Sequence, residues 1–391
     1  MIKSLIAMIA TVLALSACGD GSQTPLAAQP KILFIGNSYT FARLDPAEAY
    51  NSANVHDLTA PFAAIAPGSP WEPHPWGGVP GIFKRLTDEA GFNYDVSISA
   101  RSSETLRGHF LNTSNAAWNL RGNIASQKWD TVVLQEQSQG ALPVSKGGNV
   151  VSFNAYVDKI EQFIHVGAAQ SYTETDLFGG LASCSALFSA TSCATIRAIP
   201  ANPNANPNAR VFVTETFARP DAVYKHLDTV SDPTSPAGAP IVDRSKNPSG
   251  APAALFYNTL ADMTTDLHSS FYATAGRNRA LAGVIPVGDA FQSLFNAGLV
   301  KTSNFYDNNL VYVPNQPGDL MNLWYIDYLH ESKYGAYLYA LVSFGTITGK
   351  NPSVFGATEK AASDMGISTA DALTLQKAAA TQLGFAPIPA I

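Results

Sequence analysis

Five short apolar runs of strand character alternate along the chain with longer segments of helical periodicity. The helical patterns fall at 79–90, 154–166, 254–275 and 334–348. This alternation predicts a parallel sheet with helices on both faces, because a crossover helix must return each strand to the same direction. We expect a three-layer α/β/α sandwich around a mostly parallel, five-stranded sheet, with strands at 31–35, 94–100, 131–135, 210–214 and 282–287.

The N-terminal segment has the features of an export signal. Lys3 is followed by an apolar stretch, 5–15, that is too short to span a bilayer. The sequence that ends at Cys18, Leu-Ser-Ala-Cys, resembles a bacterial lipobox. We expect 1–18 to be a lipoprotein signal peptide and lipobox, Cys18 to carry lipid, and 19–30 to be a flexible tether. The protein would then be extracytoplasmic, anchored in the periplasmic or outer-membrane part of a bacterial envelope; an ordinary secretory signal with an incidental cysteine is the alternative.

Two further cysteines, Cys184 and Cys193, lie close together in the sequence. In an oxidising compartment they are expected to form a disulfide that closes a short loop. No Cys/His spacing matches a zinc site, and the seven histidines are scattered. The sequence therefore predicts no metal ion.

Composition limits the class of protein. Charged residues make up 14% of the chain, hydrophobic residues 46%, and the net charge is −6, as in a well-buried globular protein with a mildly acidic surface. Nucleic acid is an unsuitable partner, because it requires clustered Lys and Arg. No pattern indicates an oligomeric state.

We expect one domain over 31–350, with long insertions at 42–78 and 141–208. A helical extension, 351–391, would pack on it. The Asn-Pro repeat at 200–208 is predicted to be an exposed connector.

Ser38 follows the first predicted strand directly, and Asp327 and His330 are three residues apart near the other end of the chain. A serine hydroxyl is a poor nucleophile until an oriented imidazole takes its proton and a carboxylate holds that imidazole. The carboxyl ends of parallel strands are also where such sheets place their ligands. These three residues are therefore the predicted catalytic set.

The chain resembles the SGNH (GDSL-type) hydrolases, and within them a largely uncharacterised bacterial branch. The family's Gly-Asp-Ser block is matched by Gly36-Asn37-Ser38, and its C-terminal Asp-x-x-His block by Asp327 to His330. The resemblance implies a flavodoxin-like three-layer fold. It also implies an oxyanion hole formed by the backbone N–H groups of Ser38 and Ser103, with Ser103 in the position of a family glycine. Gln137, or Gln135 as the fallback, would supply the side-chain amide.

The activity that the resemblance implies is hydrolysis of carboxylic esters through an acyl-enzyme, without a cofactor. The substrate would be a small-molecule or polysaccharide ester, with short acyl (acetyl) groups on carbohydrate favoured. His109, Trp71 and Trp76 are candidate substrate contacts. The alternatives are a lipase or thioesterase of the same family, and a non-catalytic, glycan-binding envelope lipoprotein.

Overall fold

The sheet at the centre of the molecule contains six parallel strands in the order β10-β7-β4-β1-β3-β2. The computed structural model describes residues 29–60, 74–112, 119–223, 230–231, 240–241, 255–301, 319–325 and 327–386. The strands are β1 (Lys31–Gly36), β2 (His56–Asp57), β3 (Asp95–Ala100), β4 (Thr131–Gln135), β7 (Arg210–Thr214) and β10 (Leu281–Ile285).

The predicted three-layer fold is confirmed, and all five predicted strands are present. The sixth strand, β2, pairs with β3 at the sheet edge. It is two residues long and comes from the 42–78 segment, so it leaves no alternation for a sequence pattern to detect. The four central strands are almost completely buried, as expected for a parallel sheet covered on both faces.

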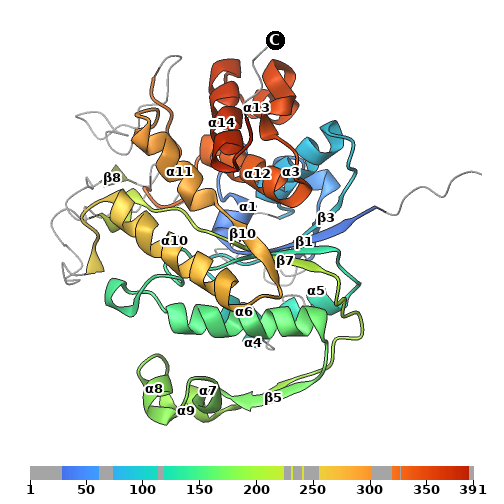
Figure 1. Cartoon of the computed structure of the whole chain (residues 1–391), viewed down its shortest axis with the longest axis vertical. Helices are drawn as coiled ribbons and strands as arrows, with labels where there is room; N and C mark the ends of the chain where they lie inside the picture. Colours follow the sequence, from blue (N-terminus) through green and yellow to red (C-terminus); the bar gives the residue numbers. More distant parts are fainter. Residues whose placement is uncertain are drawn as a thin grey trace, which may run out of the picture.

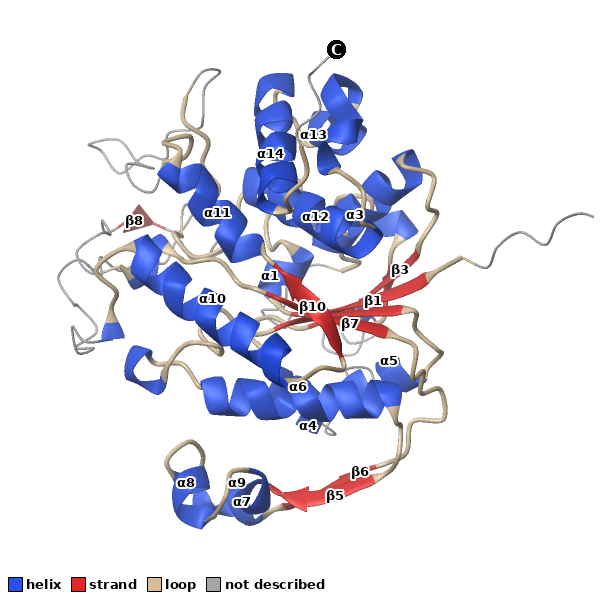
Figure 2. Cartoon of the chain, in the orientation of Figure 1, coloured by secondary structure: helices blue, strands red, loops and turns tan. Residues whose placement is uncertain are grey.

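Helices form a layer on each side of the sheet (Figures 1 and 2). One layer contains α1 (Ser38–Phe41), α3 (Gly78–Glu89), α11 (Val287–Asn296), α12 (Lys333–Thr348), α13 (Lys360–Asp364) and α14 (Thr369–Gln382). The other contains α4 (Leu106–Leu111), α5 (Leu120–Ala125), α6 (Val150–His165) and α10 (Leu260–Arg277).

The C-terminal segment covers α12, whose residues are nearly all buried. Helix α14 packs on α12 and α11, and the 3-10 segment η7 (Pro352–Thr358) packs on both α14 and α12. Smaller elements outside residues 170–199 are η1 (Ser52–Asn54), η3 (Val144–Lys146), η4 (Pro220–Ala222), β8 (Val230–Ser231) and β9 (Pro240–Ile241). Among the described residues, no helix combines the length and apolar character needed to cross a membrane.

Residues 170–199 form an arm beneath α6 in the view of Figure 1. Its antiparallel strands, β5 (Gln170–Thr173) and β6 (Ile196–Ile199), enclose three short helices, α7 (Glu174–Leu177), α8 (Leu181–Ser185) and α9 (Ala190–Ala194). The predicted disulfide between Cys184 and Cys193 is present and joins α8 to α9.

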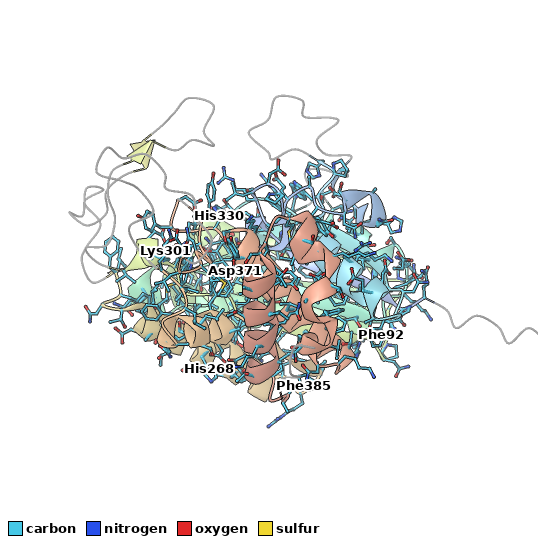
Figure 3. The ribbon with its side chains drawn as sticks, turned by 90° about the horizontal axis from the view of Figure 1, so that it is seen from above. Phe92, His268, Lys301, His330, Asp371 and Phe385 are labelled. Carbon is cyan, nitrogen blue, oxygen red and sulfur yellow. A yellow bond between two sulfur atoms is a disulfide. The ribbon has the colours of Figure 1, made fainter. Side chains whose placement is uncertain are left out.

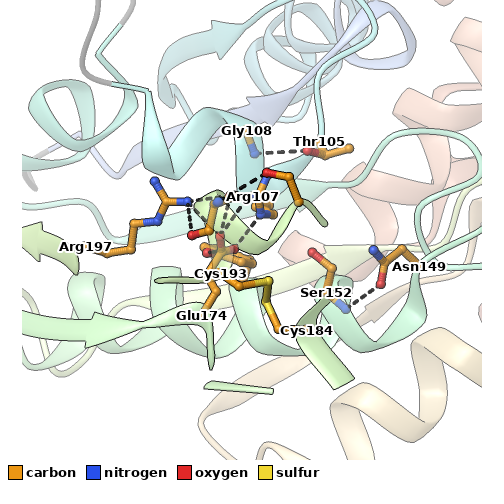
Figure 4. Close-up of polar contacts among 12 residues, drawn as sticks. Thr105, Arg107, Gly108, Asn149, Ser152, Glu174, Cys184, Cys193 and Arg197 are labelled. Atoms are coloured by element: carbon orange, nitrogen blue, oxygen red, sulfur yellow. Dashed lines mark hydrogen bonds and ion pairs between the residues drawn. A yellow bond between two sulfur atoms is a disulfide. The ribbon is translucent and has the colours of Figure 1, made fainter. Parts of the chain in front are cut away.

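A buried carboxylate attaches this arm to the body (Figure 4). Glu174 accepts hydrogen bonds from Arg107 of α4 at 2.6 and 2.7 Å and from Arg197 at 2.7 Å. The Tyr156 hydroxyl of α6 donates to it at 2.6 Å. Although burial opposes ionisation, these donors lower the pKa of Glu174 to about 2, so the attachment is ionic at neutral pH.

The predicted connector at 200–208 links β6 to β7 and is exposed at five of its nine positions, but hydrogen bonds fix its asparagines. Asn202 is buried and its amide donates to the Phe163 carbonyl, while the amides of Asn204 and Asn206 donate to two other main-chain carbonyls. The side-chain oxygens of Asn202 and Asn206 also accept the backbone N–H groups of the asparagines two residues later, at 2.9 and 3.1 Å. Asparagine is both a turn residue and a hydrogen-bonding group, so the repeat is an ordered seam between the helices and the sheet.

Candidate active site

Ser38 begins α1 immediately after β1 ends. Asn37 caps this short helix, because its side-chain oxygen accepts the N–H of Tyr39 at 3.1 Å. The Asn37 backbone N–H donates to the Gln135 side chain at the end of β4. The turn is therefore fixed from both sides, and Ser38 lies at the carboxyl edge of the sheet with 5% of its surface exposed.

The turn is compact because Gly36 has no side chain. A Cβ at this position would overlap the hydroxyl of Thr40 and the side-chain oxygen of Gln135. Those two groups are hydrogen-bonded to each other at 2.9 Å. The glycine therefore lets α1 pack directly against the end of β4.

His330 faces Ser38 across this edge. Its Nε2 lies 2.9 Å from the Ser38 Oγ, and its Nδ1 lies 2.6 Å from an Asp327 carboxylate oxygen. The other Asp327 oxygen accepts the backbone N–H groups of Leu329 and His330 at 3.0 and 2.9 Å. The structure thus brings together the three residues that the sequence analysis selected, in the order hydroxyl, imidazole, carboxylate.

The turn that carries Asp327 and His330 contains a strained residue. Tyr328 adopts the left-handed conformation, with φ of 58°, although its side chain is bulky and buried. Such a residue costs on the order of 1–3 kcal/mol and persists only where its surroundings impose it. The positive φ turns the chain so that the carboxylate can contact both the imidazole and the two N–H groups that follow it.

The charge on Asp327 is favoured by these contacts. Burial opposes ionisation, but the His330 ring and the two backbone N–H donors outweigh it and hold the pKa of Asp327 below its ordinary value. Glu331, the next residue after the histidine, is different: neither of its oxygens has a hydrogen-bond partner among the described residues. Burial raises the pKa of Glu331 well above its usual range. The surroundings of His330 therefore favour the ionised form of Asp327 and the protonated form of Glu331.

Tyr39 links the two halves of the site. Its hydroxyl donates to the Leu329 carbonyl at 2.9 Å, and its ring meets the His330 ring edge-on at 5.8 Å. The ring of Phe217 stacks on the other side of Tyr39 at 4.5 Å. Sequence analysis did not select Tyr39, because its position next to Ser38 carries no signal of which group it contacts.

The predicted oxyanion donors differ in their surroundings. Gln135 is buried, its oxygen accepts from Asn37 and Thr40, and its amide nitrogen donates to the Glu136 carbonyl. These contacts give Gln135 a structural role. Gln137 is partly exposed, and its amide nitrogen donates only weakly, to the Ser138 hydroxyl at 3.2 Å.

The hydrogen bonds that hold the loop around Gln137 could not be predicted from the sequence. Ser138 accepts a hydrogen bond from buried Arg219 at 2.8 Å, and Arg219 is paired with Asp221 at 2.9 Å. The carboxylate of Glu136, the residue before Gln137, accepts the Gln137 backbone N–H at 2.8 Å. Burial raises the pKa of Glu136 to about 7. These contacts join β4 and β7 through residues far apart in sequence, which spacing alone cannot predict.

Ser103, which stands where the resemblance implies glycine, is exposed and has φ of 60°. The backbone thus takes the left-handed conformation that glycine favours, with a serine side chain in place.

Two of the three predicted substrate contacts, His109 and Trp76, are buried side chains. His109 is fully buried, with Nε2 2.7 Å from the Gly36 carbonyl oxygen, and burial lowers its pKa to about 4. Trp76 is buried between the rings of Phe41 and His74, at 4.0 and 3.7 Å, and anchors its loop to the body. Trp71 and the lipidation candidate Cys18 lie outside the described residues.

No family model matches this sequence. No curated protein matches it either.

Several solved structures are similar to it. A suggested SGNH hydrolase from Slackia heliotrinireducens is 15% identical, with a TM-score of 0.40 over 82% of this chain and 99% of that one. A DUF4886 family protein from Bacteroides uniformis is 12% identical, with a TM-score of 0.45 over 91% and 95%. Est24, a carbohydrate acetylesterase from Sinorhizobium meliloti, is 11% identical, with a TM-score of 0.37 over 82% and 99%.

Proposed function

We propose that this protein is a serine hydrolase that cleaves carboxylic esters. The observation that carries the proposal is the chain of contacts from the Ser38 Oγ to His330 Nε2, at 2.9 Å, and from His330 Nδ1 to Asp327, at 2.6 Å. A nucleophile, a base and a group that orients the base form the constellation that acyl transfer requires. Its place at the carboxyl edge of a parallel sheet agrees with where such folds bind ligands.

In the proposed reaction the Ser38 oxygen attacks the ester carbonyl, and its proton passes to His330 Nε2. The alcohol then leaves with that proton, and the acyl group stays on Ser38. Water attacks this acyl-enzyme, again with His330 as base, and releases the acid. Asp327 holds the proton of Nδ1 in place and stabilises the imidazolium that forms in each half-reaction.

The negative oxygen of the tetrahedral intermediate would accept from the backbone N–H groups of Ser38 and Ser103 and from the Gln137 amide. Two features support Gln137 over Gln135. Gln137 is partly exposed, and its amide donates to the Ser138 hydroxyl, which also accepts a hydrogen bond from buried Arg219. Loss of one such donor typically costs about 3–4 kcal/mol in the transition state. A Gln137→Ala variant should therefore lose kcat and keep most of its affinity for substrate.

We propose short acyl esters of carbohydrate as the substrate class. The loop after β4 supports this, because Gln137 and Gln139 are partly exposed polar side chains that can bond to a hydroxyl-rich alcohol. A lipase or thioesterase would instead need a long apolar channel for the acyl chain.

The test is hydrolysis of p-nitrophenyl acetate, butyrate and decanoate by residues 20–391, beside the Ser38→Ala variant. We expect activity that is highest on acetate and absent from the variant, and a fluorophosphonate that labels the wild type alone. A labelled protein that prefers decanoate would refute the short-acyl assignment. A protein that is neither labelled nor active would refute the hydrolase and favour a glycan-binding envelope protein.

We also propose that the protein is held at a bacterial envelope membrane by lipid on Cys18. The Leu-Ser-Ala-Cys sequence after an apolar stretch supports this. A Cys18→Ala variant of the full chain should move from the membrane fraction to the soluble fraction. Retention of this variant in the membrane fraction would contradict the proposal.

A further inference from the structure

A second group of ionisable side chains lies apart from the site at Ser38, as the positions of His330 and His268 in Figure 3 show. Glu215 directly follows β7, Asp289 lies in the first turn of α11, and His268 lies on α10. One ligand atom from each of the three lies within 4.8 Å of the others. Three elements that are separate in sequence thus bring two carboxylates and an imidazole to one point.

Glu215 is the unusual member. It has no exposed surface, one carboxylate oxygen accepts the Asp289 N–H at 3.2 Å, and the other has no hydrogen-bond partner among the described residues. Burying a carboxylate without a partner is costly unless it is protonated, paired or bound to a metal ion. Burial, followed by the nearby Asp289 charge, raises the pKa of Glu215 well above its usual range.

The other two residues provide access from solvent. The side chain of His268 is 47% exposed and that of Asp289 is 19% exposed, with His268 Nδ1 at 3.0 and 3.1 Å from the two Asp289 oxygens. The Tyr272 ring stacks on His268 at 4.0 Å, and its hydroxyl donates to Asp289 at 3.4 Å. The cluster is therefore shielded from solvent at Glu215 and accessible to solvent at His268.

The spacing suits a metal ion. Ligands that share a metal at about 2.0–2.2 Å lie roughly 3.0–3.5 Å from one another, and the His268 nitrogen and the Asp289 oxygens already have this separation. Sites made of oxygen alone suit Ca²⁺ and Mg²⁺, whereas an imidazole favours first-row transition ions. Three protein ligands leave the exposed side for water.

We propose that Glu215, His268 and Asp289 bind one divalent transition-metal ion of the Zn²⁺ class. The ion would compensate the buried carboxylate and join β7, α10 and α11. The sequence predicts no metal ion, because no Cys and His residues lie at the short spacing of a zinc site. Here His268 and Asp289 are 21 positions apart, and Asp289 is 74 positions from Glu215.

The test is calorimetric titration of chelator-treated residues 20–391 with ZnCl₂, with MnCl₂, CaCl₂ and MgCl₂ as comparisons, together with Tm at each metal concentration. We expect one equivalent of Zn²⁺ and a higher Tm. His268→Ala and Glu215→Gln should each weaken binding by about tenfold or more. His268→Ala removes an exposed side chain, so it tests the proposal even if Glu215→Gln folds poorly.

The control is His56→Ala. His56 lies 3.1 Å from Asp95 and is more exposed than His268, so it removes a similar surface pair that is not part of the cluster. This variant should bind Zn²⁺ as the wild type does. The proposal is overturned if the wild type binds neither Zn²⁺ nor Mn²⁺, if it binds only Ca²⁺ or Mg²⁺, or if His268→Ala binds Zn²⁺ as tightly as the wild type.

Discussion

Two histidine–aspartate pairs in this molecule have the same chemistry and different surroundings. His330 and Asp327 are 2.6 Å apart, three positions apart in sequence and mostly buried. His268 and Asp289 are 3.0 Å apart and come from different helices, and the His268 side chain is 47% exposed against 6% for His330. A histidine–aspartate contact by itself therefore does not determine the chemical role of the histidine.

The two pairs differ in the third side chain that lies next to each histidine. At His330 the free ring nitrogen faces the Ser38 hydroxyl, a group that can lose its proton to the imidazole. At His268 the neighbour is Glu215, a second carboxylate, which has no proton to transfer when ionised and can hold a cation. We therefore propose the same kind of pair as a base in one place and as part of a metal ligand set in the other.

The largest expected difference is in hydrolysis. His330→Ala should lower kcat on p-nitrophenyl acetate by about 10⁴–10⁶-fold, because the base and the proton donor are lost together. His268→Ala should stay within about twofold of the wild type. A loss of less than tenfold for His330→Ala, or a large loss for His268→Ala, would remove the distinction between the two pairs.

The second largest expected difference is between the two aspartates, Asp327 and Asp289, in their effect on kcat. Asp327→Asn should lower kcat by about 10⁴-fold, since the amide favours the wrong imidazole tautomer. Asp289→Asn should leave kcat unchanged and weaken the binding of Zn²⁺. Steady-state kinetics and zinc titration of both variants measure this, and equal kcat values for the two would contradict the assignment of Asp327.

The pH dependence of stability should have opposite signs at the two places. Asp327 has a lowered pKa, so it stabilises the fold above its ordinary value of about 4 and loses this contribution as the pH falls. Glu215 has a raised pKa, so its contribution is complete at low pH and is lost as the pH rises through that pKa.

Urea unfolding of metal-free protein between pH 3 and pH 8 measures both effects. Relative to the wild type, Asp327→Asn should lose stability toward high pH and Glu215→Gln should gain it, by about 1.4 kcal/mol for each unit of pKa shift. Parallel curves for the wild type and Glu215→Gln would show that Glu215 has an ordinary pKa.

The smallest expected effect on kcat is at two tyrosines, Tyr39 and Tyr272, each of which contacts one of the histidine–aspartate pairs. Tyr39→Phe removes the hydrogen bond to the Leu329 carbonyl, which should cost about 1 kcal/mol of stability and lower kcat a few-fold. Tyr272→Phe removes a longer contact to Asp289 and should leave kcat unchanged. Identical kcat values for Tyr39→Phe and the wild type would show that the turn holds His330 without Tyr39.

The parts of this structure that sequence could predict are those encoded locally. Strand runs, helical periods and the Asp327 to His330 turn depend on neighbouring residues, and the structure contains all of them. The Arg219–Ser138 support and the Glu215 cluster depend on which strand ends meet, so spacing gave no sign of them. The Asn-Pro repeat has the composition of a loose connector, but its amides find main-chain carbonyls that only the folded chain provides.

The arm at 170–199 also has a mechanical consequence. It leaves the body after α6 and returns to it at Asn202, and between these points Glu174 fastens it to Arg107 on α4. Because the arm is attached at both ends and at Glu174, moving α4 away from α6 would break the contacts of Glu174 with Arg107. Helix α4 starts three residues after the exposed, left-handed Ser103. The ion pair between a surface arm and α4 therefore also restrains the helix that directly follows the Ser103 loop.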